Sequence, residues 1–247
     1  MSVAFSDFDN TVLSQNLIGT ALAGLGYSRL EFLPAAEPKG QGTHDLEPFR
    51  ARLDNVRSRF NLDQSEAARR IFIDLFIAEA LVGASHNAIV TTEYNISADK
   101  TRPGRLGHGR LDYFISSVDA KKVAPIYFPS IVIEAKKDLL TPDNATRENG
   151  QWQLLSELIT LVQLSGMKPP FLPPFLRGIF TDGRYWNFIE VSLGVPKGNN
   201  PYVMRSGKID IVDGRNQISD KATVVQNILQ YWLANYSEQR TALSPKM

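Results

Sequence analysis

Hydrophobic and polar positions recur with two different periods along this chain, and each change of period predicts a new element. From Ser65 to Val82 apolar residues recur at helical spacing and form a wide stripe, and Asp63 or Ser65 suits the N-cap of this predicted helix. Runs rich in β-branched and apolar residues follow and predict strands. The three predicted strands span 87–96, 111–118 and 130–135.

The second half of the chain predicts a polar loop, a helix, a hairpin, one or two further strands and a closing helix. The hairpin is indicated by Asp182-Gly183, a two-residue turn signal between two apolar runs. In chain order these predicted segments are 141–150, 151–164, 177–191, 203–212 and 220–236.

The order helix, three strands, helix, hairpin, strand, helix predicts an α/β protein with a mixed sheet and helices on both of its faces. The first sixty or so residues are harder to interpret. They suggest a short helix at 16–25, a Pro/Gly-rich connection at 34–44, and helical periodicity with an arginine-rich face at 46–60. We therefore predict an N-terminal extension, residues 1–62, packed on a main domain of residues 63–247.

The composition is that of an ordinary globular chain, with 43% hydrophobic and 21% charged residues. No apolar run approaches the roughly 18 residues that cross a bilayer, and the N-terminus lacks the basic and apolar regions of a secretory signal. We expect an intracellular protein, cytoplasmic or nuclear, and leave delivery as a secreted effector open. The chain has no cysteine, which excludes disulfides, thiolate zinc sites and cysteine nucleophiles.

The formal charge of +1 is lower than expected for a protein that coats nucleic acid nonspecifically. Basic residues instead form local clusters, each of which on its own fits a solvated surface. Two of these clusters flank the carboxylates Asp112 and Glu134. The clusters are Arg69-Arg70, 102–110, Lys121-Lys122 and Lys136-Lys137.

The second and third predicted strands carry the residues with the clearest chemistry. Side chains alternate along a strand, so Glu134 and Lys136 share one face while Ala135 points to the other. If the two strands pair, Asp112 joins them, and two carboxylates and an ammonium converge. Hard oxygen ligands bind a divalent cation, and a lysine beside it can handle a water molecule or a phosphate. The pattern favours phosphodiester hydrolysis over a simple surface ion pair between Glu134 and Lys136.

The segments GRLDY, IEAKK about twenty positions later, and a glutamine-led helix resemble the PD-(D/E)XK nuclease superfamily. The resemblance covers roughly Ser65 to Val191, and RGIFTDGRYWNFIEV looks like the strand–turn–strand that follows the second helix in several of these nucleases. It implies a three-layer restriction-endonuclease-like α/β fold with a mixed central sheet flanked by helices. Within the superfamily, crinkler-type effector nucleases and restriction-enzyme-like domains are the most similar.

The resemblance also implies roles for the four central residues. Asp112 would be the central metal ligand and Glu134 the second, with the backbone carbonyl of Ala135 completing the inner shell around Mg²⁺ or Mn²⁺. Lys136 would orient or deprotonate the attacking water and stabilise charge on the scissile phosphate. The expected activity is metal-dependent cleavage of nucleic acid, DNA rather than RNA. Strand preference, sequence specificity, endonucleolytic or exonucleolytic action, and homodimerisation stay open.

Many of these nucleases place another acid on the first helix and a glutamine on the second. Glu66 is preferred to Glu79 for the acid, because the strand that returns from this helix ends near the helix N-terminus. Glu66 is therefore included among the metal ligands. For the glutamine, Gln151 is preferred to Gln153, because it shares a face with the apolar residues expected to be buried.

Two other functional classes remain as alternatives. The segment Asp7-Phe8-Asp9-Asn10-Thr11 looks like the D-x-D-x-T signature of haloacid-dehalogenase-type phosphatases, with Asp7 as nucleophile and Asp9 as general acid. It lacks the long preceding strand and the downstream acidic pair of that family. The other alternative is a catalytically silent protein of the nuclease-like fold that binds nucleic acid or another protein.

Overall fold

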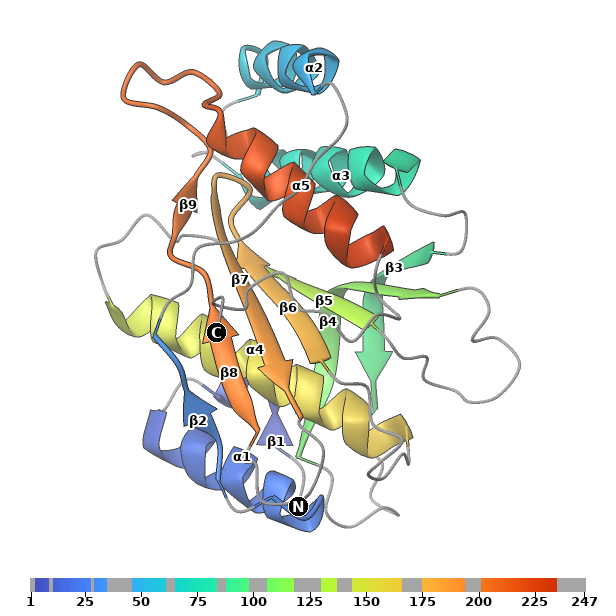
Figure 1. Ribbon diagram of the computed structural model, residues 1–247, viewed down its shortest axis with the longest axis vertical. Helices are drawn as coiled ribbons and strands as arrows, with labels where there is room; N and C mark the ends of the chain where they lie inside the picture. The colour runs from blue at the N-terminus through green and yellow to red at the C-terminus, as the bar shows by residue number, and fades with distance from the viewer. Residues whose placement is uncertain are drawn as a thin grey trace.

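The computed structural model shows a mixed α/β protein (Figure 1). Its described part comprises residues 3–8, 11–27, 29–34, 46–60, 65–83, 88–97, 106–117, 130–136, 144–165, 175–193 and 201–234. Within these residues the chain forms a nine-stranded mixed sheet, five α-helices and one short 3-10 helix. The α/β class predicted from the order of elements is confirmed.

From residue 66 onward the elements follow one another in the predicted order, whereas the short strands and the 3-10 helix near the N-terminus were not predicted. The helices are η1 Phe5–Asp7, α1 Thr11–Gly24, α2 Glu47–Arg57, α3 Glu66–Gly83, α4 Asn144–Ser165 and α5 Lys221–Ala234. The strands are β1 Val3–Ala4, β2 Glu31–Phe32, β3 Ala88–Ile96, β4 Gly107–Ser117, β5 Ser130–Ala135, β6 Phe175–Thr181, β7 Tyr185–Ser192, β8 Tyr202–Arg205 and β9 Ile209–Asp210. Helix α3 begins as expected, with Ser65 Oγ accepting a hydrogen bond from the backbone N–H of Ala68.

Three element boundaries differ from the prediction by more than three residues. Helix α1 starts at Thr11, five residues before the predicted start at 16. Helix α4 starts at Asn144, so the loop predicted over 141–150 is wrong from residue 144 onward. The apolar stripe of this helix begins only near Gln151, and hydrophobic periodicity does not detect the polar turns before it. Strand β4 starts at Gly107, because its first residues pair with neighbouring strands despite two glycines.

The centre of the sheet has the order β4-β5-β6-β7. Strands β4 and β5 are antiparallel, and Tyr113 pairs with Ile133. Strands β5 and β6 are parallel, so the chain between them needs a crossover connection, which α4 provides. Strands β6 and β7 form the hairpin predicted from Asp182-Gly183, in which Gly183 has a positive φ of 84°.

Helices cover both faces of this sheet and enclose two buried clusters. One cluster joins the sheet to α2, α3 and α5 through side chains such as Phe76, Ile133 and Trp232. The other joins the opposite face to α1 and α4 through side chains such as Val132 and Leu158. Neighbouring residues Val132 and Ile133 belong to different clusters, as the alternation of side chains along a strand requires.

The described parts of residues 1–62 belong to the same sheet and the same two clusters. Strand β1 pairs in parallel with β4, and β2 pairs in parallel with β8 at an edge (Figure 1). Helix α1 packs on α4, and α2 packs on α3. The N-terminal segment therefore contributes structural elements to the sheet that carries the candidate site residues.

Gly178 in β6 sets how closely α4 approaches the sheet. A Cβ atom at this position would lie 2.9 Å from three side-chain carbons of Leu154, a separation that real Cβ atoms essentially never show. Leu154 is fully buried and follows Gln153 directly in α4. Because Gly178 has no side chain, α4 and the polar residues on it can lie close against the sheet.

We expect Gly178→Ala to lower the free energy of unfolding by about 1–3 kcal/mol, the usual cost of overpacking a close contact. Urea denaturation followed by tryptophan fluorescence measures this change. Gly19→Ala in α1 is the control, because a Cβ there meets nothing within 4 Å. Equal stabilities of the two variants would contradict the proposed contact.

Candidate active site

Asp112 lies where strands β4 and β5 end their pairing. Beyond the pair Tyr113 and Ile133, the next residues along the same register are Asp112 and Glu134. Asp112 Oδ2 accepts a hydrogen bond of 2.8 Å from the backbone N–H of Ala135. The side chain of Asp112 therefore completes the β4–β5 ladder and is held beside the end of β5. The N–H and C=O of a strand residue point to the same edge, so we expect the Ala135 carbonyl on this side too.

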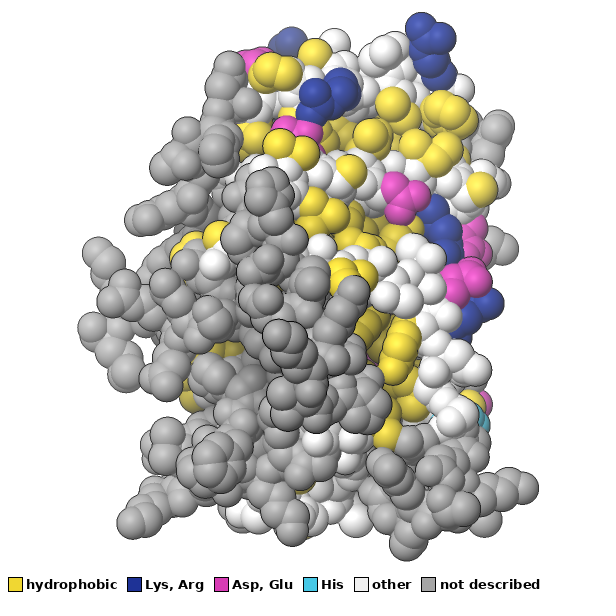
Figure 2. Space-filling model, turned by 90° about the vertical axis from the view of Figure 1, so that its right-hand side faces the viewer, with side chains coloured by type: hydrophobic (Ala, Val, Ile, Leu, Met, Phe, Trp, Pro, Cys, Tyr) yellow, Lys and Arg dark blue, Asp and Glu magenta, His cyan; other side chains and the backbone are white. Residues whose placement is uncertain are grey.

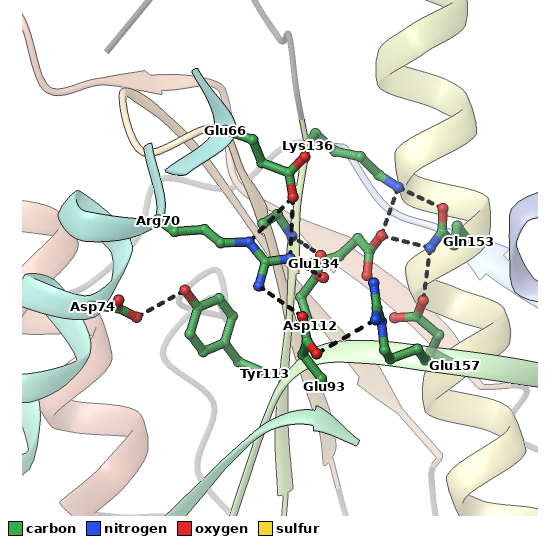
Figure 3. A network of polar contacts seen from close by, with 12 residues as sticks. Glu66, Arg70, Asp74, Glu93, Asp112, Tyr113, Glu134, Lys136, Gln153 and Glu157 are labelled. Atoms are coloured by element: carbon green, nitrogen blue, oxygen red, sulfur yellow. Dashed lines mark hydrogen bonds and ion pairs between the residues drawn. The ribbon is translucent and has the colours of Figure 1, made fainter. Parts of the chain in front are cut away.

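Glu134 and Lys136 point to the face of the sheet that α4 covers, where Gln153 joins them (Figure 3). Lys136 Nζ donates to Glu134 Oε1 at 2.8 Å and to Gln153 Oε1. Gln153 Nε2 donates to Glu134 Oε1 at 2.6 Å and to Glu157 Oε1 at 3.0 Å. One amide thus contacts two carboxylates and the ammonium, and fixes their relative positions.

The Glu134 carboxylate is only 6% exposed, and it is incompletely satisfied. Its Oε1 accepts from Lys136 and Gln153, whereas its buried Oε2 has no hydrogen-bond partner. Burial raises the pKa of Glu134, and the nearby ammonium of Lys136 opposes this effect. A buried carboxylate oxygen without a donor has the free lone pairs that a cation ligand requires.

Glu157 is a second buried acid at the site, which the sequence analysis did not identify. It is fully buried on α4, and its Oε2 also has no hydrogen-bond partner. Burial raises the pKa of Glu157 well above its ordinary value, and the negative charge of Glu134 raises it further. The spacing of Gln153 and Glu157, four residues apart on one helix face, is a signal that could have revealed the pair.

Arg70 on α3 is another contributor that the sequence analysis left unassigned. Its Nη2 lies 2.7 Å from Asp112 Oδ1, and its guanidinium also lies 3.3 Å from Glu66 Oε1 and 3.8 Å from Glu93 Oε1. Burial works against its charge, but Asp112, Tyr113 and Glu66 together outweigh this effect and raise the pKa of Arg70 above its ordinary value. Arg70 therefore brings positive charge directly onto the candidate metal ligand.

A shift in the alternation of side chains along strand β4 explains how Asp112 is reached from α3. Tyr113 contacts the cluster under α3 and α5, whereas both Leu111 and Phe114, three residues apart, contact the cluster under α4. The alternation of faces therefore shifts at this point. On the paired strand β3, Glu93 lies opposite Asp112 and has a positive φ of 54°, which is uncommon and strained for a residue other than glycine.

The structure brings together Asp112, Glu134, Ala135 and Lys136, four of the residues singled out from the sequence (Figure 3). Glu66 lies at the edge of this group, 56% exposed, and is joined to it through Arg70. The runner-up acid, Glu79, instead forms an ion pair with Arg52 of α2.

Gln153, rather than Gln151, is the glutamine beside the carboxylates. Gln151 Oε1 accepts a hydrogen bond of 3.1 Å from Arg205 Nη1 on β8. The expectation rested on one buried stripe along the helix, but α4 is buried on nearly all sides from residue 150 to 162. Burial therefore does not identify its sheet-facing side. The face with Gln153 and Glu157 continues to Thr160, whose Oγ1 accepts from the N–H of Gly107 in β4.

The N-terminal phosphatase-like motif lies only partly within the described residues. Asp7 is exposed and belongs to the short helix η1, which follows the two-residue strand β1. Phe5 and Phe8 on either side of it are buried in the cluster under α4. Asp9 lies outside the described residues. The apolar residues around Asp7 thus anchor the N-terminal segment in the core.

The donor set fits a partly hydrated magnesium ion. Among the residues that the structure describes, no three His, Cys, Asp or Glu side chains converge to hold a metal ion by themselves. Mg²⁺ usually takes one or two protein carboxylates and completes its shell with water and substrate phosphates. Asp112, the unpaired oxygen of Glu134 and the carbonyl of Ala135 match that requirement.

A scan against protein-family models finds no match to this chain, and a search of the curated proteins finds no match either. Crossing a membrane requires a combination of length and apolarity that none of the described helices has.

We expect Glu157→Gln to stabilise the protein at pH 7–8 by more than about 1 kcal/mol, the scale of an uncompensated buried polar group. The pKa of Glu157 is higher in the folded protein than the ordinary glutamate value of 4.5. Glu157 therefore lowers the free energy of unfolding by an amount that grows as the pH rises above 4.5. The difference in free energy of unfolding between Glu157→Gln and the parent protein should therefore decrease towards pH 4. Urea denaturation across this pH range, with a chelator present, measures it.

Glu47→Gln is the control for that experiment, because Glu47 is 74% exposed on α2. Its stability should stay within about 0.5 kcal/mol of the parent protein, as for most surface substitutions. A Glu157→Gln protein that is less stable at pH 8 than at pH 4, relative to the parent, would contradict the assignment.

Proposed function

We propose that this protein is a metal-dependent nuclease that hydrolyses phosphodiester bonds in nucleic acid, DNA in preference to RNA. The observation that carries the proposal is the adjacency of Asp112, Glu134 and Lys136 at the end of two paired strands, with one buried Glu134 oxygen unpaired. The element order α3-β3-β4-β5-α4-β6, with β6 parallel to β5, agrees with the resemblance to PD-(D/E)XK nucleases and a restriction-endonuclease-like fold.

Asp112, Glu134 and the carbonyl of Ala135 are the groups that would hold Mg²⁺ or Mn²⁺. Such an ion neutralises charge on the phosphate and lowers the pKa of bound water. The N–H of Ala135 orients Asp112. Lys136 and Gln153 hold one oxygen of Glu134 and direct the other away from themselves. Both carboxylates are thus oriented before any ligand binds, which limits the entropy lost on binding.

Lys136 is the residue we assign to the attacking water and the scissile phosphate. An ammonium has three N–H donors, and contacts with Glu134 and Gln153 use two of them. Its side chain is 21% exposed, so solvent and substrate can reach it. The third donor is oriented by the other two, which favours a fixed contact with a water molecule or a phosphate oxygen.

The two alternative functions, a silent binding protein and a phosphatase, each require a different arrangement of residues. A catalytically silent binding protein has no need of a buried, partly unsatisfied Glu134 beside Lys136, because burying such a carboxylate costs stability. A phosphatase that used Asp7 would place its nucleophile in the short helix η1, which contains none of these residues. The nuclease proposal accounts for the site with fewer assumptions.

The parent protein should cleave plasmid and single-stranded DNA with Mg²⁺ or Mn²⁺ and lose this activity in a chelator. Asp112→Asn should remove ion-dependent cleavage, and Lys136→Ala should slow it by about 10²–10³-fold, the usual cost of removing one donor that stabilises charge in the transition state. Gel electrophoresis of the products measures both effects.

Asp7→Asn is the control and should cleave at the parent rate. Loss of p-nitrophenyl phosphate hydrolysis in Asp7→Asn, with no DNA cleavage by the parent, would instead support the phosphatase. Retention of DNA without turnover of either substrate would support the binding protein.

Gln153→Ala should reduce cleavage by about 10–100-fold, the range found when a residue that orients metal ligands is removed. Gln151→Ala is the matched control, because this glutamine contacts Arg205 instead of the carboxylates. Initial rates at saturating Mg²⁺ compare the two variants. Equal rates for both would contradict the role given to Gln153.

A further inference from the structure

Arg70 is a cation within the candidate active site that the proposed reaction does not yet use. It extends from α3 to Asp112 in β4, and its side chain is 23% exposed. Its Nη2 lies 2.7 Å from Asp112 Oδ1, the shortest of its ion pairs with the neighbouring acids. An arginine so close to a proposed metal ligand must affect how that ligand binds a cation.

The oxygens of Asp112 are shared between two donors. Oδ2 accepts the N–H of Ala135, an interaction that the end of β5 fixes, and Oδ1 accepts Arg70. A divalent cation bound to Oδ1 would lie within a few ångströms of the guanidinium. Like charges at that separation repel strongly where solvent is largely excluded, and Asp112 is only 13% exposed. The cation and Arg70 therefore compete for the same oxygen.

Two further carboxylates give Arg70 other positions to occupy. Glu66 is 56% exposed and Glu93 is 51% exposed, and both already lie within 4 Å of the guanidinium. On the face of the molecule that Figure 2 shows, acidic and basic side chains lie beside one another. Arg70 can thus leave Asp112 without losing all of its ionic partners.

We propose that Arg70 competes with the divalent cation for Asp112 and that, once displaced, its guanidinium binds a phosphate of the nucleic-acid backbone. This inference rests on the proposed nuclease function. The planar guanidinium matches two phosphate oxygens at once, which makes arginine well suited to this exchange. Backbone phosphates of a bound strand must pass beside Asp112, within the reach that Arg70 already has.

Coupling between metal and substrate follows from this exchange. A phosphate that attracts Arg70 frees Asp112 Oδ1 for the cation, and a cation on Asp112 frees Arg70 for the phosphate. Each ligand therefore increases the affinity of the protein for the other, as thermodynamic linkage requires. Without substrate, Arg70 keeps the affinity for divalent cations low.

The first test measures Mn²⁺ binding alone, by isothermal titration calorimetry, for the parent protein and Arg70→Met. The variant should bind Mn²⁺ on the order of tenfold more tightly, within the range typical of coupled sites. Arg110→Met is the matched control, because Arg110 pairs with Glu93 at 3.5 Å and is 60% exposed. It should bind Mn²⁺ like the parent. Unchanged or weaker binding by Arg70→Met overturns the proposed competition.

The second test measures DNA binding by fluorescence anisotropy of a labelled single-stranded oligonucleotide with Mn²⁺. Lys136→Ala, which slows cleavage, serves as the background. Adding Arg70→Met should weaken binding on the order of tenfold and reduce its salt dependence by about one phosphate contact. Tighter metal binding together with weaker DNA binding is the signature of the exchange. A merely structural role for Arg70 would weaken both.

The outcomes separate this inference from the function on which it rests. A parent protein that binds no Mn²⁺ overturns both the nuclease proposal and the exchange. A parent that binds Mn²⁺ and cleaves DNA, with no gain in Arg70→Met, overturns the exchange alone. Thermal unfolding verifies that each variant is folded, and Arg70→Gln, which keeps a polar side chain of moderate length, replaces Arg70→Met if that protein does not fold.

Discussion

The carboxyl group of Glu134 is almost completely removed from water, and its neighbours are arranged around that constraint. A buried carboxylate is costly unless charged or polar groups compensate it. Lys136 supplies the charge and Gln153 supplies the amide, but Gln153 reaches Glu134 only because α4 lies close against the sheet. That approach depends on the absence of a side chain at Gly178. The packing of α4 against the sheet therefore determines which groups surround the Glu134 carboxylate.

The site also draws on both faces of the sheet. Glu134 and Lys136 face α4, which carries Glu157, whereas Arg70 comes from α3 on the opposite face. These groups meet at Asp112 because the regular alternation of β4 shifts there, beside the strained backbone of Glu93. Strain of this kind persists where the surrounding structure imposes it, and it is often found at functional sites.

Much of the site could be predicted from the sequence wherever side chains follow a regular period along a strand or helix. Alternation along a strand predicted that Glu134 and Lys136 share a face, and the structure joins them through a direct ion pair. The choice of glutamine failed for a physical reason: α4 is buried nearly all round, so no apolar stripe marks its sheet-facing side. The role of Arg70 was not predictable, because it depends on the shift in alternation of β4 beside Glu93, where no glycine signals an unusual backbone.

The two short strands near the N-terminus have a consequence for how the protein folds. Strands β1 and β2 pair with β4 and β8, whose residues lie far along the chain. Such distant pairings raise the contact order, and loop-closure entropy opposes them until most of the sheet has formed. Folding should therefore be slow and finish late at these strands. Until β2 is in place, the backbone of β8 is an open edge at which two partly folded molecules can pair and aggregate.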